Sequence, residues 1–170
     1  LCYNLPVLQA VCQGQGKSLY LFPTKALAQD QVAELLALNQ AGGLGVRAYT
    51  FDGDTPGDAR KAVRTRGDIV VSNPDMLHQA ILPHHTKWAQ FFEGLRYIVL
   101  DEMHTYRGVF GAHVANLIRR LRRILTFYGA SPQFVFCSAT IANPVELATA
   151  LLGEEVAAVT RSGAPRGERR

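Results

Sequence analysis

Short apolar runs alternate along this chain with longer stretches of helical pattern. The runs are rich in Val, Ile, Tyr and Phe, and they cover residues 18–22, 47–51, 68–72, 96–101 and 133–139. Several are continuously apolar instead of alternating with polar positions, which is typical of strands that are buried on both faces of a sheet. We therefore predict five strands in a sheet whose two faces are both covered.

Helical signals fill the stretches around these runs. Residues 25–40 are nearly all strong helix formers, and residues 144–153 open with Pro and close with Gly. Residues 55–66 carry Pro early and an acid in the first turn, and residues 5–13 form a further apolar helix candidate. Strands that alternate with helices predict an α/β fold of three layers, with a mainly parallel sheet between helices.

The clearest helix covers residues 109–128, where eight apolar positions repeat at helical spacing to form one buried stripe. They are Phe110, Val114, Leu117, Ile118, Leu121, Ile124, Leu125 and Tyr128. Four arginines of the same segment fall mostly off this stripe: Arg119, Arg120, Arg122 and Arg123. We interpret them as a solvated helix face, with a nucleic-acid-binding patch as the alternative.

Composition limits the class of protein. The chain has 170 residues, of which 48% are apolar and 19% charged, as expected for one globular domain. Its net charge of +4 permits an anionic partner without demanding one. No apolar stretch approaches a membrane span and no signal-peptide pattern opens the chain, so we expect a cytoplasmic protein without a membrane partner. Three cysteines without a Cys-x-x-Cys pair indicate reduced thiols.

The sequence GQGKS, residues 14–18, superficially matches the end of a phosphate-binding loop. The first glycine of that motif belongs at position 11, where Val11 stands. The context is also inverted, because a helix candidate precedes the glycines and a strand follows them. We predict a helix-to-strand turn with a solvated Lys17, and no P-loop within this chain.

Polar residues follow several of the predicted strands, where ligands bind in open parallel sheets. Asp101 and Glu102 come directly after the run at 96–101. In nucleotide hydrolases the first such acid holds Mg²⁺ and the second orients or deprotonates the attacking water. A helix N-cap followed by a solvated acid fits the dipeptide alone equally well.

Three further strand ends carry hydroxyl or amide side chains: PTKALAQDQ (23–31), SNPDML (72–77) and SAT (138–140). Thr24 can cap the next helix while the N–H groups of that helix face a phosphate. The run at 18–22 is not followed by the glycines of a dinucleotide-binding loop, which excludes that class of enzyme.

These four segments, in this order and spacing, resemble motifs Ia, Ib, II and III of superfamily-two DEAD/DExH helicases. Motif II reads Asp-Glu-Met-His, which fits the DExH form. Further stretches, among them LCYNLPVLQA, YTFDGDTP and SATIANPVELA, are similar to the bacterial YprA-like DNA helicases, whose full-length members carry a C-terminal zinc-binding domain.

The resemblance implies a RecA-like domain, the first of two, over residues 1–160. Residues 161–170 would be the linker into the second RecA-like domain, and the chain would begin immediately after the P-loop. The implied cofactors are ATP and Mg²⁺. The implied partners are single-stranded or duplex DNA, with RNA not excluded, and the second RecA-like domain.

The resemblance also assigns roles to single residues. Asp101 would coordinate Mg²⁺ through water, Glu102 would polarise the attacking water, and His104 would link the ATP site to Ser138 and Thr140. Six positions would lie along the nucleic-acid path: Thr24, Lys25, Gly53, Asn73 and the backbone of Pro74 and Asp75. For Lys25 a solvated side chain is an equal alternative.

We therefore predict the N-terminal motor domain of an ATP-dependent DNA helicase. The alternative is a module that binds nucleic acid without hydrolysing ATP. His78, His84 and His85 lack the spacing of a metal site. We interpret Trp88, Phe91 and Phe92 as packing residues instead of base-stacking ones.

Overall fold

All five predicted strands are present in the computed structural model, which describes residues 2–160 and residue 163. They form one sheet in the order β2-β3-β1-β4-β5, and every neighbouring pair is parallel. The strands are β1 (Lys17–Leu21), β2 (Ala48–Thr50), β3 (Ile69–Ser72), β4 (Leu95–Leu100) and β5 (Gln133–Phe136). The predicted α/β class is confirmed.

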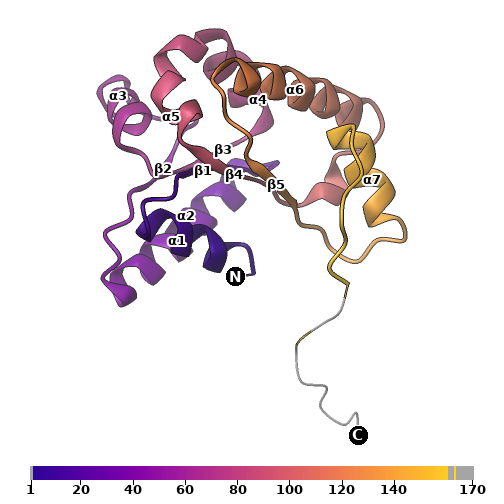
Figure 1. The fold of residues 1–170 in the computed structure, drawn as a ribbon, viewed down its shortest axis with the longest axis horizontal. Helices are drawn as coiled ribbons and strands as arrows, with labels where there is room; N and C mark the ends of the chain where they lie inside the picture. Colours follow the sequence, from indigo (N-terminus) through magenta and orange to yellow (C-terminus); the bar gives the residue numbers. More distant parts are fainter. Residues whose placement is uncertain (1, 161–162, 164–170) are drawn as a thin grey trace, which may run out of the picture.

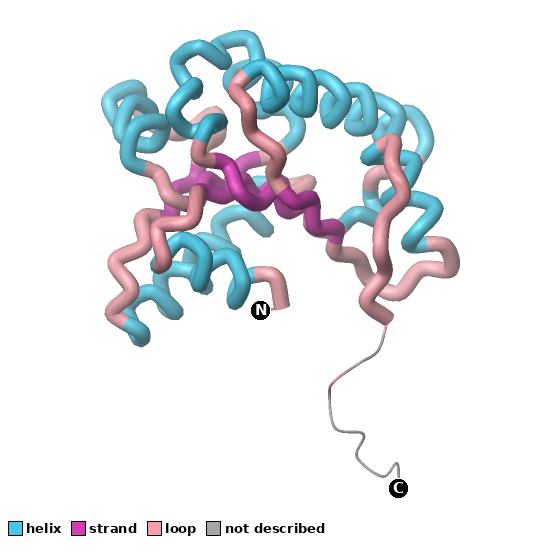
Figure 2. Tube along the Cα trace, viewed as in Figure 1, coloured by secondary structure: helices cyan, strands magenta, loops and turns pink. Residues whose placement is uncertain are grey.

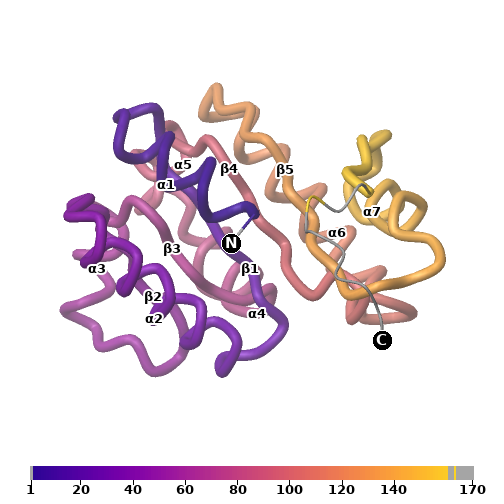
Figure 3. Tube along the Cα trace, turned by 90° about the horizontal axis from the view of Figure 1, so that it is seen from below, coloured from indigo at the N-terminus to yellow at the C-terminus, as the bar shows by residue number. Residues whose placement is uncertain are grey.

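Helices cover both faces of this sheet and produce three layers (Figures 1 and 2). On one face lie α1 (Asn4–Cys12) and α2 (Lys25–Gly42), and Figure 3 views the sheet from their side. The other face is covered by α3 (Gly57–Arg66), α5 (Ala89–Glu93) and α6 (Gly108–Phe127). The last helix, α7 (Pro144–Leu152), lies against α6 beside the outer strand β5.

The side chains of the central strands divide between two hydrophobic cores. Leu19, Leu21, Val70, Ile98 and Leu100 join the core beneath α3, α5 and α6. The alternate positions Tyr20, Ile69, Val71 and Val99 join the core beneath α1 and α2. Because successive strand residues point to opposite faces and both faces are covered, these strands are apolar along most of their length.

The arginine-rich helix α6 buries most of its predicted stripe, including Val114, Ile118 and Leu121. Phe110 differs from the prediction, because its side chain is 41% exposed. It lies in the first turn of α6, where its ring contacts Tyr106 at a centroid distance of 5.6 Å. The predicted spacing of apolar residues on α6 is therefore correct, but the first turn of the helix, with Phe110, lies beyond the edge of the core.

Helical turns that the sequence pattern did not delimit connect β3 to β4. They are α4 (Pro74–Met76), the π-helical turn η1 (Leu77–Ile81) and the 3₁₀ segment η2 (Leu82–Trp88), which leads into α5. Trp88, Phe91 and Phe92 from this segment are all buried, and Trp88 meets Phe51 edge to face at 4.9 Å. Their interpretation as packing residues is confirmed.

The glycines of GQGKS form a turn between α1 and β1, as predicted. Gly16 has φ +140°, and a Cβ added there would lie 2.7 Å from Arg96 Cβ and 2.8 Å from the Gly94 carbonyl oxygen. The expectation of a solvated Lys17 was wrong. This lysine is half-buried, its Nζ lies 5.8 Å from the centroid of the Phe91 ring, and burial lowers its pKa.

The predicted linker at 161–170 lies outside the described residues, apart from Gly163. The domain boundary at residue 160 therefore stays a prediction. None of the helices described here has the length and hydrophobicity that crossing a bilayer requires.

We expect Gly16→Ala to destabilise the chain, because Gly16 combines a positive φ with a backbone contact that a methyl group would violate. The expected loss is about 1–3 kcal/mol in the free energy of unfolding, measured by urea denaturation. Gly57→Ala is the matched control, since Gly57 opens α3 with nothing within 4 Å of its added Cβ. Equal effects of the two substitutions would contradict the strain assigned to Gly16.

Candidate functional site at the carboxyl edge of the sheet

The parallel strands bring five chain segments together at one edge of the sheet. Backbone hydrogen bonds hold these segments in place just beyond the strand ends. Phe22 N–H donates to the Ser72 carbonyl at 3.0 Å, and Asp101 N–H donates to the Leu21 carbonyl at 3.1 Å. Met103 N–H donates to the Cys137 carbonyl at 2.8 Å. The candidate residues of all four predicted motifs therefore share one surface.

The two acids occupy a strained turn at the end of β4. Glu102 has φ 52° and is the only described residue other than glycine with a positive φ. Its backbone N–H donates to Asp101 Oδ1 at 2.8 Å, and Thr105 Oγ1 donates to its carbonyl at 2.8 Å. Such conformations cost about 1–3 kcal/mol and concentrate at functional sites. The turn leads into the 3₁₀ segment η3 (Met103–Thr105).

The acid pair suits Mg²⁺ by the chemistry of its donors. Both side chains are partly exposed and offer carboxylate oxygens. Mg²⁺ is commonly bound through one or two carboxylates, with phosphates and water completing its shell. Among the residues that the structure describes, no group of three or more potential ligands forms an all-protein metal cage. The nearby Cys137 is not an anionic ligand, because burial and, next, the charge of Asp101 raise its pKa to about 11.

His104 lies between the acid turn and the segment that follows β5. Its Nε2 is 3.3 Å from Glu102 Oε2, and its Nδ1 accepts from Ala139 N–H at 3.4 Å. Because Nδ1 is the acceptor, the neutral imidazole carries its hydrogen on Nε2, facing the carboxylate. Ser138 and Thr140 flank this contact and are both exposed. The structure thus places the predicted catalytic and coupling residues in one contiguous group.

The hydroxyl of Tyr3 also reaches this group, which the sequence pattern did not indicate. It lies 2.6 Å from Asp101 Oδ2 and 2.5 Å from Gln31 Oε1. Burial raises the pKa of Tyr3, and the hydrogen bond to Asp101 raises it further, so the phenol is a donor. An aromatic residue next to an apolar helix usually signals packing, so periodicity gave no clue to this polar contact.

The residues predicted for the nucleic-acid path lie at the ends of β1, β2 and β3. Thr24 caps α2 by accepting from Leu27 N–H at 3.4 Å. Lys25 Nζ forms an exposed ion pair with Asp54 at 2.9 Å, and the hydrogen bond to Asp54 raises its pKa. A Cβ added at Gly53 would be 3.8 Å from the same Nζ. Lys25 is therefore exposed beside Gly53, but a carboxylate already pairs with it.

In the predicted segment at the end of β3, residues 72–77, the side chain of Asn73 caps the helical turns that follow. Asn73 Oδ1 accepts from Met76 N–H at 2.8 Å and starts the helical turns that follow. Pro74 is buried, whereas Asp75 is exposed. Ser72 Oγ donates to the Phe51 carbonyl at 2.6 Å, which ties this segment to the end of β2.

Arg60 of α3 holds the loop after β2, although no sequence motif marked it. Its guanidinium donates to the carbonyls of Thr55 at 2.9 Å, Asp52 at 3.3 Å and Gly53 at 3.4 Å. The same group lies 5.3 Å from the centroid of the Phe51 ring. One cation therefore fixes the loop that presents Gly53 at the edge.

Two of the three histidines of η1 and η2 have partners, and these partners are different. His85 Nδ1 lies 2.8 Å from the Tyr128 hydroxyl, and His78 Nδ1 lies 3.4 Å from Arg120 Nη1. No metal-ligand group forms from them within the described part of the chain.

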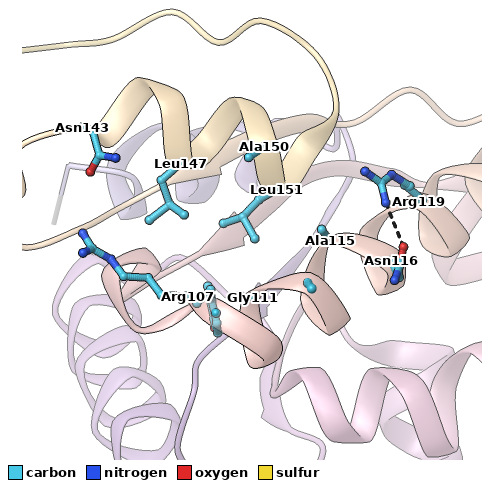
Figure 4. A pocket seen from close by; sticks show the side chains of 12 residues that line it. Arg107, Gly111, Ala115, Asn116, Arg119, Asn143, Leu147, Ala150 and Leu151 are labelled. Atoms are coloured by element: carbon cyan, nitrogen blue, oxygen red, sulfur yellow. Dashed lines mark hydrogen bonds between the residues drawn. The ribbon is translucent and has the colours of Figure 1, made fainter.

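A hollow of about 460 Å³ opens between α6 and α7 (Figure 4). Arg107, Gly111, Asn143 and Leu147 are among the residues that line it. Asp101, Glu102 and His104 do not line it, so this hollow is separate from the candidate site.

Comparison with known proteins identifies the family of this chain. The family model described as DEAD/DEAH box helicase matches residues 1–148. The chain is 58% identical over 170 residues to the ATP-dependent helicase YprA of Bacillus subtilis, covering 99% of this chain and 23% of that protein. It is 41% identical over 175 residues to the ATP-dependent helicase hrq1 of Schizosaccharomyces pombe, covering 100% of this chain and 16% of that protein.

Solved structures give the same result. The crystal structure of the DUF1998 helicase MrfA bound to DNA and AMPPNP superposes with a TM-score of 0.94 at 59% identity, over 98% of this chain and 24% of that chain. Mycobacterium smegmatis helicase Lhr, bound to single-stranded DNA and AMP-PNP, matches with a TM-score of 0.67 at 26% identity, over 85% of this chain and 20% of that chain. This chain thus spans about a quarter or less of the proteins it resembles.

We expect Asn73→Ala to lower the free energy of unfolding by about 1 kcal/mol, because the helical turns after β3 lose their N-cap. Asn73→Asp retains the capping oxygen and should stay close to the unaltered chain. Urea denaturation of the two variants is the measurement. If the two variants lost the same stability, Asn73 would not act through its cap.

Proposed function

Because the chain belongs to the DEAD/DEAH box helicase family, we propose that it forms the first RecA-like motor domain of an ATP-dependent DNA helicase. In this proposal residues 1–160 form the domain, and residues 161–170 lead into a second RecA-like domain. The acid turn carries the proposal, since Glu102 adopts a left-handed conformation between Asp101 and His104 at the end of a buried strand.

We propose that Asp101 and Glu102 divide the chemistry of ATP hydrolysis. Magnesium at the nucleotide phosphates supplies charge neutralisation during phosphoryl transfer. Asp101 would hold this ion through water. One oxygen of Glu102, Oε2, faces His104, and Oε1 has no hydrogen-bond partner among the described residues. Glu102 Oε1 is thus available to accept a hydrogen bond from water and to polarise it as the nucleophile.

His104 would transmit the state of this site to the segment after β5. Its imidazole contacts Glu102 on one side and the backbone of Ala139 on the other. Ser138 and Thr140 present exposed hydroxyls beside that contact. We assign these hydroxyls to hydrogen bonds with the second RecA-like domain, so that hydrolysis is coupled to domain closure.

Nucleic acid would lie along the other half of the edge, over Thr24, Lys25, Gly53, Asn73, Pro74 and Asp75. The similarity to MrfA, whose crystal structure contains DNA, supports DNA as the partner, with RNA not excluded. Contacts of this type go largely to phosphates and position a strand without reading its sequence. Lys25 would have to exchange its Asp54 partner for a phosphate.

We expect the Glu102→Gln variant to bind ATP but to lose most of its ATPase activity, because an amide cannot polarise water as a carboxylate does. A suitable protein is a chimaera in which residues 1–170 replace the matching segment of Bacillus subtilis YprA. Steady-state ATPase rates and nucleotide binding are measured together. Asp101→Asn should in addition weaken the Mg²⁺-dependent binding of ATP.

Near-normal turnover in the Glu102→Gln chimaera would overturn the catalytic assignment. DNA binding without ATP hydrolysis in the unaltered chimaera would favour the alternative function, a nucleic-acid-binding module.

We expect Ser138→Ala combined with Thr140→Ala to spare much of the DNA-stimulated ATPase activity and to impair strand separation. These hydroxyls are too weakly basic to activate water, and Glu102 is available for that step. Each lost hydrogen bond is worth about 0.5–1.5 kcal/mol, enough to bias a closure between two states. Parallel ATPase and unwinding assays on the chimaera test this. Equal loss in both assays, with an unchanged melting temperature, would place the hydroxyls in catalysis instead.

A further inference from the structure

Three elements of the fold meet at the hydroxyl of Tyr3. The tyrosine itself precedes α1, Asp101 follows β4, and Gln31 belongs to α2. The hydroxyl oxygen lies 2.6 Å from Asp101 Oδ2 and 2.5 Å from Gln31 Oε1. No other described side chain hydrogen-bonds to either Asp101 oxygen. Tyr3 is thus the one side chain, within the described residues, that orients this carboxylate.

The surroundings leave this hydroxyl little freedom. The Tyr3 ring meets the buried Tyr20 ring edge to face, with centroids 5.4 Å apart. Tyr20 is itself held by a hydrogen bond of 3.0 Å to the buried Asn4. On the other side Gln31 Nε2 donates to Glu34 at 2.6 Å. That bond fixes the amide, because a rotated amide would turn its oxygen toward the Glu34 carboxylate.

A single phenolic hydrogen faces two acceptors in this arrangement. When Tyr3 donates to Asp101, the short contact with Gln31 Oε1 brings two oxygens together without a hydrogen. When it donates to Gln31, Asp101 Oδ2 loses the phenolic hydrogen, and only Oδ1 keeps a donor, the Glu102 N–H. A charged carboxylate is the stronger acceptor, so the two contacts compete unequally. The position of Gln31 therefore affects how firmly Asp101 is held.

Gln31 lies on the helix whose first residues were placed on the nucleic-acid path. Thr24 caps α2 and Lys25 is its first residue, so Gln31 follows by six residues, about 9 Å along the axis. Gln31 is buried, whereas Thr24 and Lys25 are exposed. Because Lys25 and Gln31 belong to one continuous helix, a displacement of its start would also displace Gln31 relative to Tyr3.

We propose that Tyr3 is a positioning residue that links the nucleic-acid end of α2 to the Asp101 carboxylate. It does not touch the reacting atoms. Through Gln31 it responds to nucleic acid at α2, and through Asp101 it sets the geometry of the magnesium-holding carboxylate. This inference rests on the proposed function, since it takes Asp101 as the Mg²⁺ holder and Thr24 and Lys25 as nucleic-acid contacts.

The test compares three variants of the YprA chimaera. Tyr3→Phe removes the hydroxyl and keeps the ring against Tyr20. Tyr97→Phe is the matched control, because Tyr97 is a β4 tyrosine that packs against the same core as Tyr20, and its hydroxyl has no hydrogen-bond partner in the described structure. Gln31→Leu removes the amide on α2. Calorimetry measures AMPPNP binding across a series of Mg²⁺ concentrations, with and without oligothymidine, and a melting curve checks folding.

In Tyr3→Phe we expect the Mg²⁺ concentration for half-maximal AMPPNP binding to rise about tenfold, as for other residues that orient a metal ligand. Tyr97→Phe should match the unaltered chimaera. Oligothymidine should shift the Mg²⁺ requirement of the unaltered chimaera, and this shift should disappear in both Tyr3→Phe and Gln31→Leu. A purely structural role would change the melting temperature without removing the response to oligothymidine.

Three outcomes overturn the inference in distinguishable ways. An unchanged Mg²⁺ requirement in Tyr3→Phe would remove Tyr3 from the metal site. If the Mg²⁺ requirement of Gln31→Leu still responds to oligothymidine, the proposed link through α2 is wrong. Gln31→Leu therefore tests this link even if Tyr3→Phe fails to fold. An unaltered chimaera that binds no AMPPNP at any Mg²⁺ concentration would refute the proposed function itself, and the inference with it.

Discussion

The parallel pairing of β1 with β4 is the interaction on which both halves of the site depend. It aligns Leu21 with Leu100, so that the segments starting at Phe22 and Asp101 leave the sheet side by side. The Asp101 N–H extends the same pairing by donating to the Leu21 carbonyl. An antiparallel partner would have sent one of these segments to the opposite edge. The direction of these two buried strands thus places the acids Asp101 and Glu102 at the same edge of the sheet as the hydroxyl of Thr24.

Burial on both faces makes this pairing rigid enough to hold a strained turn. Leu19, Ile98 and Val99 are fully buried, from one face or the other. The left-handed backbone of Glu102 is locally unfavourable, and the bonds from Asp101 to β1 and from Met103 to Cys137 keep the turn from relaxing. A flexible edge would let Glu102 return to an ordinary conformation and turn its carboxylate away from His104.

The strands were predictable because short, continuous apolar runs rich in Val, Ile and Phe are typical of buried strands in a globular chain. The acids and hydroxyls at the strand ends were found for the same reason, since each follows directly from a recognisable run. Tyr3, Gln31 and Arg60 were missed because their roles arise from contacts between distant segments, which no local pattern records. Lys17 and Phe110 were misjudged where a helix or strand meets the limit of the core, and periodicity does not locate that limit.

The acid pair is contacted from two sides, and the two contacts differ in kind. His104 reaches across to the segment after β5, which is exposed and would face a second domain. Tyr3 reaches across to α2, which packs against the core and whose exposed start carries Thr24 and Lys25. Asp101 is bound on the α2 side and Glu102 on the β5 side. The two carboxylates that follow β4 therefore have different side-chain partners, Tyr3 for Asp101 and His104 for Glu102.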